Sequence, residues 1–172
     1  MVDNNFTSNL FHFDIHNFLK EIIMFTNILC ATNLNDTSSE AVKKAVQLAH
    51  QYNSKIFMLN VHEEFMTKEE MRMLRVSIDT MKISFEKTSV KAKDEMKDEL
   101  KTLHAEDIEV EYLIKEGKSN QVICEEAKRV GADLIIMGLF EKKSVSNLIF
   151  RSTASYVIEH IKVPVLVVPM KN

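Results

Sequence analysis

The order of apolar segments constrains the fold of this chain more than any other feature of its sequence. Short, nearly unbroken apolar runs alternate with longer stretches in which apolar residues recur every three or four positions. Unbroken runs are typical of strands buried on both faces, and recurrence at threes and fours is typical of helices that pack on one face. The alternation therefore predicts a doubly wound parallel α/β sheet, with right-handed crossovers and helices on both faces.

Five strands are expected from the apolar runs. They are Asn27–Thr32, residues 55–61, residues 109–114, residues 134–137 and Val165–Val168. The segment at 109–114 alternates apolar and polar residues, which is typical of a strand nearer the edge of a sheet.

The connecting helices are indicated by caps and by apolar periodicity. Ser38 or Ser39 can cap the first helix, with Glu40 in its first turn. Two later helices are expected at residues 119–130 and 148–161, each with apolar residues on one face.

One apolar stripe is too long for a single helix of a small domain. It runs over residues 67–104, which would be roughly 55 Å at 1.5 Å per residue. We therefore expect either a break within residues 71–77 or an end that projects beyond the sheet.

Composition narrows the classes of function. The net charge is −3 and the sequence has no basic tract, so nothing favours nucleic-acid binding. No apolar run approaches the roughly 20 residues of a membrane span, so no membrane partner is expected. Cys30 and Cys124 lie in apolar-periodic segments, which favours two buried, reduced thiols in a cytoplasmic protein.

The first 23 residues are set apart from the domain expected at residues 24–172. Their apolar residues at helical spacing are Phe11, Ile15, Phe18, Leu19 and Ile22. Polar residues interrupt this pattern, so it is not typical of a signal peptide. Two interpretations stay open. Either the native protein starts at Met24 and the preceding residues are not native, or they form a helix that covers an apolar patch or a partner.

The segment over residues 132–153 predicts a ligand site. An apolar strand ends at Gly138, a polar loop follows, and Ser152 and Thr153 open another helix-like stretch. In an open parallel sheet the carboxyl end of a strand and the amino end of a helix converge, and free backbone N–H groups point at a ligand there.

Three segments resemble universal stress proteins. They are NILCATNLNDTSSEAVKKA, EGKSNQVICEEAKRVGADLIIMG and VPVLVVP, and the resemblance spans residues 25–170. It implies a Rossmann-like, five-stranded sheet in the order 3-2-1-4-5. It also implies a homodimer whose last strands meet at the sheet edge, a role that falls here on Val165, Leu166, Val167 and Val168.

The resemblance extends in part to a nucleotide motif. Family members that bind ATP carry G-x2-G-x9-G-[ST], which starts here at Gly138 and places Glu141, Arg151 and Ser152 at its next three positions. An Asp that lies near adenosine in those members is replaced by Asn33. The pocket residues that the resemblance implies are Thr32, Asn33, Val61, Met137, Gly138, Glu141, Arg151, Ser152 and Thr153.

The replacements oppose close phosphate binding. The Glu141 carboxylate would repel a polyphosphate by on the order of a kcal/mol or more, and both Glu141 and Arg151 carry a Cβ where glycine would let the backbone approach. Arg151 can instead bind phosphate or pair with Glu141, or both can be solvated loop charges. Asn33 can still hydrogen-bond a ribose, but it accepts less strongly than a carboxylate.

Two functions are consistent with these sequence features. The first is a stress-response homodimer that acts as a binding or regulatory module through protein partners. It neither binds ATP tightly nor requires a cofactor. The second is an ATP- or AMP-binding switch that uses residues 138–152, with at most weak hydrolysis. No catalytic or metal site is expected, and His62 is interpreted as a polar loop residue rather than a general base.

Overall fold

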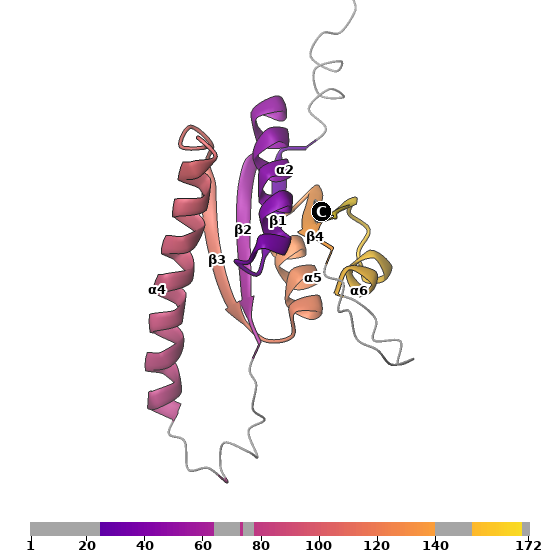
Figure 1. The fold of residues 1–172 in the computed structure, drawn as a ribbon. Coiled ribbons are helices and arrows are strands. Elements are labelled where there is room, and N and C mark those ends of the chain that lie inside the picture. Colours follow the sequence, from indigo (N-terminus) through magenta and orange to yellow (C-terminus); the bar gives the residue numbers. More distant parts are fainter. Residues whose placement is uncertain (1–24, 64–72, 74–77, 140–152, 170–172) are drawn as a thin grey trace, which may run out of the picture.

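The computed structural model describes residues 25–63, 73, 78–139 and 153–169, and Figure 1 shows their arrangement. The elements in chain order are β1 (Asn27–Thr32), α2 (Asp36–Tyr52), β2 (Lys55–His62), α4 (Ile78–Thr102), β3 (Val110–Glu116), α5 (Ser119–Arg129), β4 (Leu134–Gly138), α6 (Thr153–His160) and β5 (Val165–Val168).

The five strands form one parallel sheet in the order β3-β2-β1-β4-β5, as predicted. β1 lies at the centre, where Ala31 is in register with Leu59 of β2 and Met137 of β4. Residues 28–30 of β1 are completely buried, which explains why that segment is apolar without alternation. β3 and β5 are the two edges.

Two layers of helices cover the two faces of the sheet. On one face, Ile28, Cys30 and Met58 pack in a cluster with α2 and α4. On the other face, Leu29 and Met137 pack in a second cluster with α5 and α6. Because successive strand residues point to opposite faces, each central strand contributes to both clusters.

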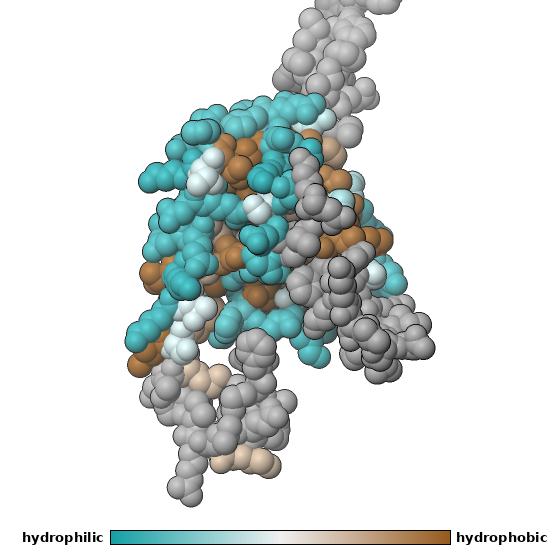
Figure 2. Space-filling model, viewed as in Figure 1, coloured by the Kyte–Doolittle hydropathy of each residue, from teal (hydrophilic) through white to brown (hydrophobic). Residues whose placement is uncertain are grey.

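α4 extends beyond the sheet, as one of the two alternatives predicted. Its 25 residues span about 37 Å, whereas the seven residues of β3 span about 23 Å. Figure 1 shows the lower end of α4 running past the end of β3. On this helix Met96 is fully buried, while Ile83 and Val90 are exposed. Hydrophobic surface is accordingly visible near the lower end of α4 in Figure 2.

Other boundaries differ from the sequence predictions. α2 begins at Asp36, so neither Ser38 nor Ser39 precedes it as a cap. Ser38 lies instead in the first turn, where its hydroxyl donates to the Asn35 carbonyl at 3.0 Å. β3 continues to Glu116 because Lys115 and Glu116 still pair with Val61 and His62 of β2.

Two predicted features lie wholly or partly outside the described residues. The break expected within residues 71–77 falls on residues that the structure does not describe, apart from Met73. Of the helix expected at 148–161, residues 148–152 are not described; its described part is α6, Thr153–His160, which ends one residue before the predicted end. The helix expected at 119–130 is α5, and Val130 is its C-cap.

Candidate functional site

The carboxyl ends of β1 and β4 lie side by side at the point where the strand order reverses. Ala31 is opposite Met137, so Thr32 and Asn33 leave β1 beside Gly138, the last residue of β4. Thr32 is also in register with Asn60, which brings Val61 of β2 next to this point. Such a reversal is where open α/β sheets bind ligands. The structure thus brings these five predicted residues (Thr32, Asn33, Val61, Met137 and Gly138) together at the carboxyl end of the sheet.

Thr32 shapes the loop between β1 and α2. Its side chain is buried, its hydroxyl lies 2.9 Å from the Ser38 Oγ, and it accepts the Leu34 N–H at 3.1 Å. Its carbonyl accepts a hydrogen bond from the Asn60 Nδ2 at 2.9 Å. Thr32 therefore positions the loop, and its hydroxyl is already engaged there. Ser38 and Asn60 are positioning residues that were not predicted from the sequence as part of the site.

Asn33 presents a neutral amide at the opening of the site. It is exposed and precedes Leu34, whose φ of 59° lies in the left-handed region that non-glycine residues rarely adopt. The hydrogen bond from the Leu34 N–H to the Thr32 hydroxyl holds this turn. The turn directs the chain away from the sheet and leaves Asn33 beside the end of β4.

The apolar side of the site is formed by Met137 and Val61. Met137 is 5% exposed and shares a core cluster with Ala154 of α6, and Val61 packs against the same cluster. The start of α6, at the half-buried Thr153, therefore lies on the face toward which these two side chains point.

The remaining predicted pocket residues lie outside the described part of the chain. They are Glu141, Arg151 and Ser152. Whether Glu141 and Arg151 pair stays a prediction.

The N-terminus of α5, which follows β3 at the same end of the sheet, is capped by a side chain of the protein itself. The carboxylate of Glu63, just after β2, accepts the N–H of Ser119 at the start of α5, with a distance of 3.0 Å. The turn before α5 needs glycine, because Gly117 has a φ of +131° and an added Cβ would lie 3.2 Å from the Val122 Cγ2. His62 is the last residue of β2 rather than the loop residue that had been predicted, and its backbone carbonyl accepts the Gly117 N–H.

The two cysteines are buried, as predicted. Cys30 lies fully inside the sheet, and burial, with a smaller contribution from the Glu99 carboxylate, raises the pKa of its thiol to about 12. Burial also raises the pKa of the Cys124 thiol. Because the thiolate is the nucleophilic form, neither side chain is suited to covalent catalysis.

The described ranges hold neither a metal-binding group nor a membrane-spanning helix. No group of three or more His, Cys, Asp or Glu side chains there is placed to hold a metal ion. Of the helices in those ranges, none combines the length and apolar character that a membrane span requires.

Comparison with known proteins identifies the family. The model of the universal stress protein family matches residues 24–169. The chain belongs to the universal stress protein family. It is 26% identical over 159 residues to universal stress protein MJ0577 of Methanocaldococcus jannaschii, covering 87% of this chain and 98% of the relative. It is 21% identical to universal stress protein Sll1388 of a Synechocystis species, covering 84% and 97%.

Solved structures agree with this assignment. The MJ0577 structure superposes with a TM-score of 0.68 at 26% identity, covering 87% of this chain and 99% of that one. A family member from Arabidopsis thaliana with AMP bound gives 0.54 at 18% identity, covering 85% and 92%. A universal stress protein in complex with cAMP gives 0.61 at 20%, covering 86% and 99%. At these identities the last two establish the Rossmann-like fold alone.

Proposed function

We propose that this universal stress protein is a cytoplasmic, homodimeric binding or regulatory module of the stress response, and that it does not bind ATP tightly. The observation that carries the proposal is the chemistry of the loop after β1. Asn33, at the position where ATP-binding members carry an Asp, presents an exposed neutral amide there, and the Thr32 hydroxyl is bonded within the loop. A ribose hydroxyl would thus meet a weaker acceptor than a carboxylate.

The sequence of the loop after β4 supports the same proposal. Gly138 keeps the first glycine of the phosphate motif, whereas Glu141 and Arg151 replace the next two. A carboxylate opposes bound phosphates, and a Cβ at each position keeps the backbone from approaching them. Arg151 offsets this loss only if its guanidinium turns toward the phosphates rather than toward Glu141.

Restoring the glycines tests the blocking effect. The double variant Glu141→Gly with Arg151→Gly should bind Mg-ATP at least tenfold more tightly than the unmodified protein, a gain of about 1.4 kcal/mol. Lys142→Gly with Lys143→Gly is the matched control, since it loosens the same loop without changing the motif positions. Equal affinities of both double variants and the parent protein would refute blocking by Glu141 and Arg151.

A second candidate is a nucleotide switch that binds ATP or AMP with at most weak hydrolysis. It is favoured by the convergence of Asn33, Val61 and Gly138 at the reversal of strand order. It is also favoured by relatives of the same fold that were solved with AMP and with cAMP. In this case Arg151 acts as a phosphate ligand, so Arg151→Ala should weaken AMP binding, whereas the blocking proposal expects no loss.

The homodimer is proposed from the edge strand β5. Leu166 is 37% exposed although it lies in an apolar strand, and Val165 and Val167 are half-buried. A short apolar edge strand offers backbone N–H and C=O groups to a second copy.

A charged residue introduced into β5 tests the proposed dimer. Sedimentation velocity should show a dimer for the unmodified protein and a monomer for Leu166→Lys. Val90→Lys, at a 63% exposed position of α4, should remain dimeric. A monomer in the unmodified protein at all concentrations would exclude the homodimer.

A further inference from the structure

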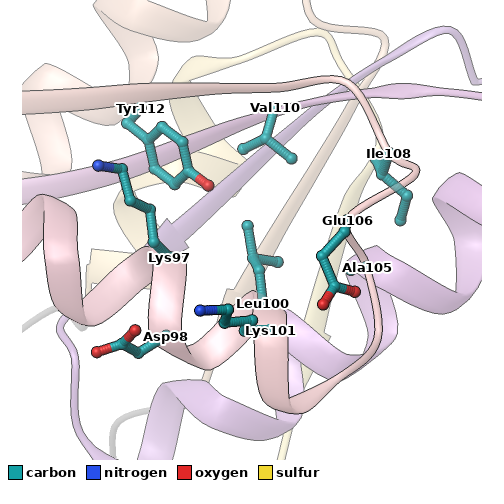
Figure 3. Close-up of a pocket in the computed structure, with 9 residues that line it drawn as sticks. All are labelled: Lys97, Asp98, Leu100, Lys101, Ala105, Glu106, Ile108, Val110 and Tyr112. Carbon is teal, nitrogen blue, oxygen red and sulfur yellow. The ribbon is translucent and has the colours of Figure 1, made fainter.

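We draw no further inference here: the strongest candidate, the hollow of about 420 Å³ between the last turns of α4 and the start of β3 (Figure 3), is lined by apolar side chains and by charged side chains of both signs, and nothing in the described part of the structure shows what covers it.

Discussion

Thr32 and Asn33 are neighbours in the sequence, yet their side chains serve different purposes. Both were predicted in the pocket, and both lie at the reversal of strand order. The role of Thr32 in the loop depends on Ser38 and Asn60. Because these partners come from α2 and from β2, no local pattern in the sequence could indicate that the Thr32 hydroxyl is already bonded.

Glu126 is a buried carboxylate of α5 that contacts two cations. Its carboxylate lies 2.8 Å from an Arg129 guanidinium nitrogen and 3.2 Å from the Lys115 Nζ. Burial alone would raise the pKa of the Glu126 carboxyl, but the hydrogen bonds from Arg129 and Lys115 outweigh it and hold that pKa below its ordinary value. The ionised form is therefore favoured in the folded state.

Glu126→Gln should lower the free energy of unfolding by about 1 kcal/mol at neutral pH. A depressed folded-state pKa contributes stability that is present above the ordinary carboxyl pKa of about 4.3 and is lost as the pH falls through the folded value. The difference from the unmodified protein should therefore shrink in acid. Urea unfolding across pH measures it, and Glu125→Gln, at an exposed neighbour, is the control. A difference that is constant with pH would contradict the ionic role.

At the scale of elements, strands were easier to predict than helix ends. Asn27–Thr32 and Val165–Val168 were predicted with their observed limits, because burial on both sides imposes an apolar run. The start of α2 was misplaced, since Ser38 is a typical cap but uses its hydroxyl within the first turn. The carboxyl end of β3 was predicted too early, because its last two residues, Lys115 and Glu116, are polar and lie at the end of an edge strand.

α4 is expected to be stabilised by its second half. Met96→Ala should lower the free energy of unfolding by about 2–5 kcal/mol, because Met96 is fully buried in the cluster beneath α2 and α4. Val90→Ala, on the same helix at a 63% exposed position, should change it by no more than about 0.5 kcal/mol. Chemical denaturation followed by circular dichroism compares the two. Similar losses in both variants would mean that the helix packs differently.

At the scale of the whole molecule, the sequence predicted the fold and only part of the site. The alternation of strand-like runs with helix-like segments along the sequence predicted a parallel sheet. The family resemblance supplied the order of its strands, and the structure confirms that order. Glu141, Arg151 and Ser152 lie outside the described residues, so the phosphate side of the pocket stays a prediction. The proposed homodimer depends on a surface shared by two copies of the chain, which residue spacing alone does not determine.

Calorimetric titration of the purified protein with Mg-ATP, followed by AMP, tests the central claim most directly. Asn33, Glu141 and Arg151 each replace a residue that ATP-binding members use, so we predict no saturable heat, or a Kd weaker than about 100 μM. A Kd tighter than that for either nucleotide would contradict the account. It would show that Arg151 substitutes for the missing glycines and that the protein works as a nucleotide switch.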